Sequence, residues 1–506
     1  MEKEALKELI AFMQSKGFIW GPSPEIYGGL AGFYTFAPLG KLLKNNVEEA
    51  IRKTFQKYEM YEVECPTVMP ARVWEASGHL TGFTDPMIEC EKCKSIFRVD
   101  TLIEEFLPEQ TISGLKNKEL LKIIKAHKIK CPTCSGKLRE EIKQHSLMMR
   151  TTVGVDIEAY NRPETATTTY LPFTRYVDFF RDKLPFGIFQ IGKAFRNEIS
   201  PRQHVLRMRE FTQAEAQLFI FEDQKNEFEP YNDVKDRELP IWSSSMQKEK
   251  KQPAFIKIED AILKGWLTNR AFAWTLYIAY DLFLNIGIPK EKMRFRQHQD
   301  DEKAFYVEDA WDLEIQLNTF GWTECCGVHD RSNYDLKQHS KFSGKELVAR
   351  DYKNNKQIPH ILEIAFGTDR PTFALLDLFY EKRVKGEGKT MFKVPYKLAP
   401  IKVAVFPLVN KEKLPEIAQQ IHRELLKDFT AVYDKSGAIG RRYLRNDEAG
   451  TPFCITVDFQ TLEDKTVTIR NRDDEKQIRI KVEELKSILT KLFEGSKLSD
   501  FGKYIN

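Results

Sequence analysis

Alternation of apolar and polar residues predicts a pair of neighbouring strands near the middle of the chain. In the run GIFQIGKAFRNE, residues 187–198, an extended backbone puts Arg196 and Glu198 on one face. The polar stretch 199–206 contains a proline and predicts a loop. The run after this loop alternates again, and four side chains share one of its faces: Phe211, Gln213, Glu215 and Gln217. Two such strands would present an arginine, an aromatic ring and carboxylates on one open surface.

Two interpretations of this strand–loop–strand unit follow from the alternation alone. The first is a half-buried antiparallel hairpin with one solvated face, which is the commoner arrangement. The second is a nucleotide platform, on which the Phe211 ring stacks on a base and Arg196 pairs with a phosphate in bidentate fashion. The carboxylates would then accept hydrogen bonds from amino groups.

Periodic patterns elsewhere predict both helices and strands. Residues 42–58 and 271–284 have the spacing of helices, and residues 311–330 and 358–366 have that of strands. A further helix is predicted from about residue 370. This mixture predicts an α+β fold.

The pattern changes after a linker at residues 396–400. Residues 401–405 and 453–459 are compact apolar strands, and an amphipathic helix is predicted between them. We therefore predict a separate α/β domain over residues 399–506.

Two segments interrupt the regular pattern. Residues 87–145 open and close with cysteine pairs around a lysine-rich amphipathic stretch, which predicts an inserted module. Residues 221–300 begin charged and irregular and continue into a helix, which predicts a second, charged and helical insertion.

Composition and charge narrow the class of protein. The 506 residues are 42% hydrophobic and 30% charged, which is ordinary for a globular protein of three or four domains. The formal net charge is only +4, so a nucleic-acid-binding surface would have to be local. No apolar run is long enough to span a membrane, and the N-terminal MEKEALKELIAFMQSKGF lacks the apolar centre of a signal peptide. We therefore expect a cytoplasmic protein without membrane attachment.

Four of the eight cysteines form two closely spaced pairs. Cys90 and Cys93 form one pair, Cys131 and Cys134 the other, and 37 residues separate the pairs. Two such pairs can coordinate Zn²⁺ tetrahedrally, and four thiolates would leave no open position for catalysis. The alternative is four unrelated thiols; we favour a structural zinc site.

Short strings around the predicted strands resemble class II aminoacyl-tRNA synthetases. FRNEISPR and RMREFTQAE, on either side of the loop described above, are similar to motif 2 of this class. GTDRP, between a strand and a helix, is similar to motif 3, and Arg370 would stand at a helix N-terminus that favours phosphate. The helix–strand unit over 42–66 resembles motif 1, which implies a homodimer. The resemblance also implies an antiparallel-sheet catalytic domain formed by residues 1–86 and 146–398.

An ATP site and a bridging Mg²⁺ follow from the same resemblance. Arg196 would meet the α-phosphate and Arg370 the γ-phosphate, and both are assigned to catalysis together with Glu198. Phe211 would stack on adenine, and Glu198 would accept from its amino group. The other expected ATP contacts are Asn197, Arg207, Met208, Glu324 and Cys325.

Three further strings resemble the glycyl branch of the class: RPETA at 162–166, GWTECCG at 321–327 and DRSNYDL at 330–336. This implies that Glu164, Glu215 and Glu363 surround the glycine ammonium, with Ile364 and Ala365 beside them. The branch usually has proline and serine at the last two positions, and glutamine where Thr167 stands here. None of these changes removes a charge.

The string SGAIGRRYLRNDEAG, residues 436–450, resembles the anticodon-binding domain shared by the glycyl, threonyl, prolyl and histidyl enzymes. Arginines beside a tyrosine suit phosphate contacts and base stacking, although a solvated loop would show the same composition. The predicted tRNA contacts are Arg441, Arg442, Tyr443 and Arg445.

The resemblance as a whole implies ATP-dependent attachment of glycine to tRNA(Gly) through a glycyl-adenylate. No residue stands out as a dedicated general base, so we expect catalysis by positioning and charge stabilisation. The alternatives are a sister synthetase with the same anticodon domain and a non-catalytic RNA-binding relative. The three glutamates argue against the first, and Arg196 and Arg370 argue against the second.

Overall fold

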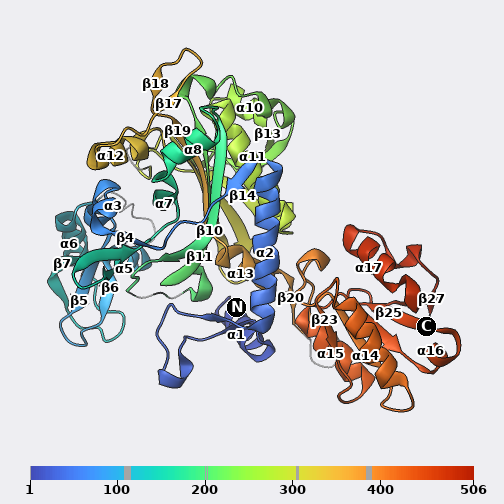
Figure 1. Cartoon of the computed structure of the whole chain (residues 1–506). Coiled ribbons are helices and arrows are strands. Elements are labelled where there is room, and N and C mark those ends of the chain that lie inside the picture. Colours follow the sequence, from blue (N-terminus) through green and yellow to red (C-terminus); the bar gives the residue numbers. More distant parts are fainter. Residues whose placement is uncertain are drawn as a thin grey trace.

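A nine-stranded sheet forms the centre of the N-terminal part of the chain (Figure 1). The computed structural model describes residues 2–107, 115–199, 201, 203–303, 307–382 and 390–505. In sheet order the strands are β13 (Ala254–Lys257), β12 (Glu238–Trp242), β14 (Met293–Gln297), β15 (Asp309–Leu317), β16 (Gly321–Asp330), β19 (His360–Gly367), β11 (Glu210–Ile220), β10 (Phe186–Phe195) and β3 (Met60–Glu62). Neighbours are antiparallel except at β12–β14 and β10–β3, so the predicted antiparallel core is confirmed.

The strands β10 and β11 are the pair that the alternation predicts. Gln190 lies opposite Glu215, and Ala194 lies opposite Phe211. Because side chains alternate along a strand, Phe211, Gln213 and Glu215 project from one face of the sheet. Arg196, which follows β10 by one residue, projects on the same side as Phe211.

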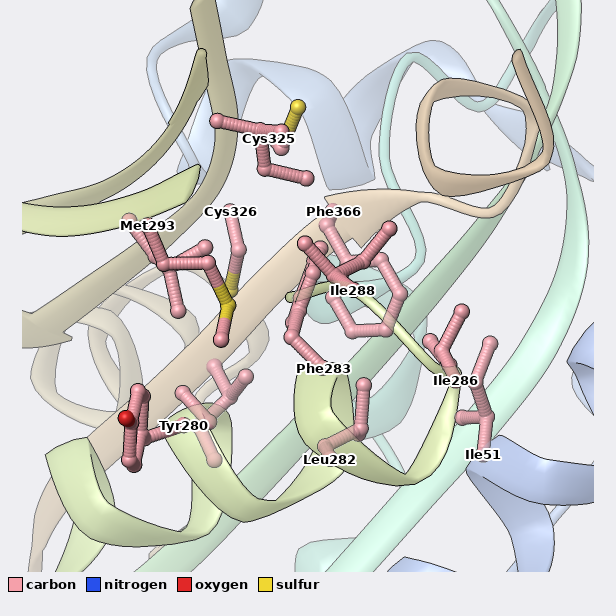
Figure 2. Packing of buried hydrophobic residues seen from close by; sticks show 14 of the residues in the cluster. Ile51, Tyr280, Leu282, Phe283, Ile286, Ile288, Met293, Cys325, Cys326 and Phe366 are labelled. Atoms are coloured by element: carbon pink, nitrogen blue, oxygen red, sulfur yellow. The ribbon is translucent and has the colours of Figure 1, made fainter. Parts of the chain in front are cut away.

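Helices cover the opposite face of the sheet. These are α2 (Pro38–Lys57), α11 (Arg270–Asn285) and α13 (Asp369–Phe379), and their apolar sides lie in one hydrophobic cluster with the strands. Figure 2 shows Leu282 and Phe283 of α11 packed near Cys326 of β16 and Phe366 of β19. The sheet is therefore apolar on its helix side, and its polar side chains face the other way.

The segment 221–300 differs from its prediction. It supplies β12, β13 and β14 to the edge of the main sheet, and its helices α10 (Ile258–Leu263) and α11 are buried in the same cluster as the catalytic core. The prediction of a separate insertion is wrong for this segment. Most of its charged residues are exposed, while the apolar side chains of the same elements pack into the shared core. Lys225 is an exception, because it is buried and paired with Asp330.

The cysteine-bearing segment does form a module of its own. Its sheet has the order β6 (Ile96–Arg98), β5 (Thr84–Cys90), β7 (Leu138–Ser146), and its helices are α5 (Val99–Phe106) and α6 (Asn117–Ala126). These elements enclose a separate small hydrophobic cluster that includes Ile88, Leu102 and Leu120. In Figure 1 the module lies on the side of the catalytic domain away from the C-terminal domain.

Shorter elements surround the polar face of the main sheet. They are β4 (Val68–Pro70), β8 (Met149–Val153) and β9 (Ile157–Asn161), which form a small sheet, with α3 (Ala71–Ala76), α4 (His79–Gly82), α7 (Ala166–Tyr170), α8 (Phe173–Phe179) and α12 (Tyr334–Ser343). The N-terminal helix is α1 (Glu2–Lys16), and three hairpins pair β1 (Ile19–Trp20) with β2 (Thr35–Phe36), β17 (Ala349–Arg350) with β18 (Lys356–Gln357) and β20 (Tyr380–Glu381) with β21 (Met391–Phe392). Within the described residues, no helix has both the length and the apolarity needed to cross a membrane.

The C-terminal residues fold around a second, six-stranded sheet, as predicted for an α/β domain. Its order is β23 (Ala431–Tyr433), β22 (Val403–Pro407), β24 (Phe453–Val457), β25 (Thr466–Asn471), β26 (Gln477–Lys481), β27 (Tyr504–Ile505). The first three strands are parallel and the last three pairings are antiparallel. The helices α14 (Leu414–Leu425), α15 (Ile439–Ala449), α16 (Phe459–Asp464) and α17 (Leu485–Glu494) complete the domain.

Candidate active site

The register of three neighbouring strands assembles the site. Glu215 on β11, Ala365 on β19 and Gly327 on β16 are directly opposite one another, and Glu363 and His329 are paired in an adjacent row. All of these residues face away from the helices, because their neighbours in sequence fill the core. They open into a cavity of about 340 Å³, whose lining includes predicted residues from both half-sites: Glu164, Arg196, Glu198, Arg207, Met208, Phe211, Glu215, Glu324, Cys325, Glu363, Ala365 and Arg370.

Among the three pocket carboxylates, Glu363 is held by a tyrosine, an arginine and a histidine. It is buried, and it accepts hydrogen bonds from the Tyr170 hydroxyl at 2.9 Å and from Arg331 Nη1 at 3.2 Å. His329 Nδ1 lies 3.4 Å away. Burial opposes ionisation, but Arg331 and His329 outweigh it and hold the pKa of Glu363 below its ordinary value. Glu363 is therefore a carboxylate at neutral pH.

Glu215 is in a different electrostatic position. Its carboxyl accepts from Thr165 Oγ1 at 2.5 Å and from the Gln213 amide, both of which are neutral. Burial raises the pKa of Glu215 to about 8, and the charges of Glu363 and Glu164 add to the shift. In the free protein at neutral pH, Glu215 is thus predominantly protonated.

Glu164 lies at the edge of the pocket, next to α7. Thr167 Oγ1 donates to it at 2.6 Å, and His79 Nε2 lies 3.5 Å from its other oxygen. Burial works against its charge, but His79 and Arg331 hold the pKa of Glu164 well below the ordinary value. Thr167 stands where the glycyl branch usually has glutamine, and its hydroxyl donates a hydrogen bond to Glu164, three residues before it.

Arg331 is a residue of this pocket that the sequence reasoning named only as part of a string. Its guanidinium bonds Asp335 in bidentate fashion at 2.9 and 3.0 Å while it contacts Glu363. Asp335 is buried at the start of α12 and holds the arginine in place. The DRSNYDL spacing, with Arg331 and Asp335 one helical turn apart, was the signal that could have revealed this pair.

The ATP residues gather at the other end of the cavity. Arg196 Cζ lies 5.4 Å from the ring centroid of Phe211 and 5.4 Å from that of Phe83. Its Nε donates to the Pro163 carbonyl at 3.1 Å, which leaves the terminal amino groups toward the cavity. Glu198 is buried nearby, 3.9 Å from Arg207 Nε.

Arg370 and Glu324 are brought together by a bulge. Arg370 Nη1 donates to the Glu324 main-chain carbonyl at 2.7 Å and to its carboxylate at 3.0 Å. The pairing of β15 with β16 shifts register at Leu313/Glu314, so Cys325 is an extra residue and Glu324 joins Gly327 on the polar face. Sequence alternation alone would have put Glu324 on the core side.

For three of the residues predicted to contact a ligand, burial or main-chain hydrogen bonds limit which of their atoms can reach it. Ile364 is fully buried among the core residues behind β19, so its side chain does not reach the glycine pocket. Cys325 is likewise fully buried and belongs to the same hydrophobic cluster, so its side chain has no exposed surface to offer a nucleotide. The main chain of Asn197 is held by the cysteine module: its N–H donates to Leu147 at 2.8 Å and its carbonyl lies 2.9 Å from His145 Nε2.

The four paired cysteines converge as a metal site requires. Cys90 Sγ is 3.6 Å from Cys134 Sγ, Cys93 Sγ is 3.6 Å from Cys131 Sγ, and all four sulfurs lie within 4.8 Å of one another. Four sulfurs about 2.3 Å from a tetrahedral Zn²⁺ would be about 3.8 Å apart. The residues present therefore fit a zinc ion.

The predicted tRNA contacts in α15 divide into two kinds. Arg441 and Arg445 are exposed. Arg442 is buried, and its guanidinium bonds the carbonyls of Pro407 and Gly437. Tyr443 is packed against Phe406 and its hydroxyl is 2.6 Å from Thr456 Oγ1. Of the exposed pair, Arg445 is bonded to Asp434 and to the Ser436 carbonyl, so a phosphate that meets Arg445 would have to displace this ion pair.

Family models match both parts of the chain. The model described as tRNA synthetase class II core domain (G, H, P, S and T) matches residues 156–379, and the one described as anticodon binding domain matches residues 402–492. A solved prolyl-tRNA synthetase from Cryptosporidium parvum, complexed with halofuginone and AMPPNP, has a TM-score of 0.57 at 15% identity and shares the fold, with 96% of this chain and 76% of that chain covered. Fold and site thus define a class II aminoacyl-tRNA synthetase.

Curated relatives specify the branch. The glycine–tRNA ligase of Thermococcus gammatolerans is 40% identical over 97% of this chain and 98% of its own length. Those of Methanocaldococcus jannaschii and Pyrococcus furiosus are each 39% identical, over 96% and 98% of this chain and 98% and 100% of their own. The chain therefore belongs to the glycine–tRNA ligase family. The predicted enzyme class and its predicted amino acid are confirmed.

Proposed function

We propose that this cavity forms glycyl-adenylate, with Glu164, Glu215 and Glu363 holding glycine and with Arg196, Glu198, Phe211 and Arg370 holding ATP. The observation that carries the proposal is the convergence of three carboxylates and two phosphate-binding arginines on one cavity. The glycine carboxylate attacks the α-phosphorus, and pyrophosphate leaves. A terminal ribose hydroxyl of tRNA(Gly) then attacks the adenylate carbonyl, the acyl–phosphate bond breaks, and AMP leaves as the hydroxyl proton is released.

Glycine has no side chain to grip, so its pocket must hold the ammonium and exclude larger amino acids. Glu363 and Glu164 attract the ammonium, while Ala365 and the His329 ring bound the space beside it. A β-carbon on Gly327 would lie 2.6 Å from the His329 ring, so the ring already fills that side. Excluding one methyl group in this way is worth roughly 1–3 kcal/mol.

Arg196 and Phe211 form the nucleotide platform. Arg196 neutralises charge at the α-phosphate, Phe211 stacks on adenine, and Glu198 accepts from the adenine amino group. Arg370 receives the γ-phosphate and exchanges its present bond with Glu324 for that contact. Arg207, Met208 and the main chain of Cys325 complete the nucleotide contacts, and Asn197, whose main-chain N–H and carbonyl are bonded to Leu147 and His145, supports them through its place beside Arg196 and Glu198.

Two metals accompany these roles. Mg²⁺ arrives with ATP, and Glu324 is the exposed carboxylate that can hold it once Arg370 turns to phosphate. A Zn²⁺ on Cys90, Cys93, Cys131 and Cys134 stabilises the inserted module, and it stays outside the chemistry because all four positions are thiolates.

The chain acts as a homodimer in this proposal. The strand β3 is one of the two edge strands of the main sheet and carries Tyr61, half of which is exposed beside the exposed ring of Phe179. An open edge with exposed aromatic side chains is suited to pairing with a second copy. Sedimentation analysis tests this, and a monomer at micromolar concentration would refute it.

Arg441 and Arg445 contact the anticodon loop through its phosphates. We place the enzyme in the cytoplasm, because none of the eight cysteines, all of which lie among the described residues, is in a disulfide, as a reducing compartment favours.

Pyrophosphate exchange tests the residue roles. Glycine, but neither alanine nor serine, should stimulate exchange between pyrophosphate and ATP. Arg196→Ala should abolish exchange while tRNA binding is retained, and Glu164→Gln should raise the KM for glycine. Equal loss of exchange and tRNA binding in Arg196→Ala would contradict its assigned role.

A further inference from the structure

Two arms join the cysteine module to the catalytic domain, and each arm contacts the active site. The incoming arm is α4 and the start of β5, residues 79–84. The outgoing arm is the end of β7 and the residue that follows it, residues 145–147. The arms are held together where Thr84 pairs with Ser146 and where the Leu147 N–H donates to the Phe83 carbonyl at 3.1 Å.

The incoming arm reaches the glycine pocket through His79. Its Nε2 lies 3.5 Å from Glu164, and its Nδ1 is 2.7 Å from the Ser77 hydroxyl. A carboxylate only accepts hydrogen bonds, so a hydrogen bond across this contact requires a hydrogen on Nε2. The rings of Trp74 and Phe83 flank the imidazole at 5.6 and 5.5 Å, which fixes its orientation.

The outgoing arm reaches the ATP residues through His145. Its Nε2 donates to the Asn197 carbonyl at 2.9 Å, while the Asn197 N–H donates to Leu147 at 2.8 Å. Both polar groups of the Asn197 main chain are thus bonded to this arm, directly after Arg196. Phe83 of the other arm lies against the Arg196 guanidinium.

We infer that His79 and His145 are positioning residues for the first step, His79 for glycine through Glu164 and His145 for ATP through the Arg196–Asn197 main chain. Through these two segments, the cysteine module positions both the glycine-binding and the ATP-binding residues. This inference rests on the roles proposed above for Glu164 and Arg196.

The test compares the KM for glycine with the KM for ATP in pyrophosphate exchange by the full-length enzyme, and each histidine variant should change only one of them. His79→Ala should raise the KM for glycine about tenfold and leave the KM for ATP within about twofold, as expected for losing one hydrogen bond to a charged group. His145→Ala should do the reverse. His145→Gln keeps an N–H for the Asn197 carbonyl and should recover most of the ATP affinity. His127, exposed on the same module, supplies the matched control His127→Ala, which should change neither value.

Melting temperature and bound metal are measured for every variant. If an alanine variant unfolds, the same split is required of His79→Asn or His145→Asn, whose side chains are too short for these contacts. Unchanged KM values in folded variants, or an equal rise in both, would overturn the inference. Glu164→Gln and Arg196→Ala separate the two proposals: wild-type behaviour in those variants refutes the residue roles, whereas wild-type behaviour in the histidine variants alone refutes only the positioning.

Discussion

Glu215 and Ala365 lie directly opposite each other on β11 and β19. On its β19 side, the buried carboxyl that is expected to meet the glycine ammonium therefore has a single methyl group as its cross-strand neighbour. Directly opposite residues have β-carbons about 4.5–5.5 Å apart, so a larger side chain at 365 would enter the space beside Glu215.

Enlarging Ala365 should therefore obstruct glycine itself. We expect Ala365→Val to raise the KM for glycine about tenfold or more and to leave the KM for ATP near its original value, because the added methyl groups enter only the glycine end of the cavity. Ile364→Val is the matched control: its side chain lies in the core, so it should cost about 1 kcal/mol of stability without changing the glycine KM. A glycine effect from Ile364→Val would contradict the assigned faces of β19.

Glycine binding should release a proton from Glu215. The pKa of this group in the free protein is about 8, so at pH 7 it is mostly protonated and must ionise to pair with an ammonium. Because ionised Glu215 predominates above this pKa, glycine affinity should rise with pH between about 6.5 and 8 and then level off.

Calorimetry in buffers of different ionisation enthalpy measures this release, and close to one proton per glycine is expected at pH 7. Glu215→Gln should abolish it. Uptake of protons, or no exchange in the wild type, would exclude the assigned protonation state.

Removing one sulfur ligand should release the metal. Cys131→Ser should reduce the zinc content from about one ion per chain to near zero and should lower the thermal midpoint, because metal binding and folding of the module are coupled. Atomic absorption measures the zinc content. Cys454→Ala, in the C-terminal sheet, should keep its zinc. A metal-free wild-type enzyme with the same thermal midpoint would refute the site.

The two kinds of arginine in α15 should respond differently to replacement. Arg441→Ala should raise the KM for tRNA a few-fold, weaken the salt dependence of tRNA binding and leave pyrophosphate exchange unchanged. Arg442→Ala should instead lower the free energy of unfolding by about 2 kcal/mol, because the buried Pro407 carbonyl and the part-buried Gly437 carbonyl lose their donor. Chemical denaturation and aminoacylation kinetics distinguish the two, and the opposite pattern would reverse the assignment.

The local chemistry of the site could be predicted from the sequence. The placement of Phe211 and Glu215 on one face follows from a two-residue period that any extended strand obeys. The cysteine spacing predicted the sulfur cluster for a similar reason, since each short pair can fold back on one ion.

Segment 221–300 was misread because charge along a sequence reports the solvent side of an element and not what lies behind it. Its strands join the main sheet, and α11 is buried against β16 and β19. The burial of Arg442 escaped prediction for the same reason, since a charged run is ordinarily solvated.

What the sequence determined by itself is the set of reacting groups: the phosphate arginines, the stacking ring, the carboxylates and the cysteine pairs. Only the tertiary structure decided how these groups are supported. Tyr170 and Glu363 are 193 residues apart in the chain and bond at 2.9 Å, and a bulge at Cys325 turns Glu324 to the polar face. Periodicity describes the contacts of a residue with its own element, whereas cross-strand register and buried ion pairs depend on which distant elements pack together.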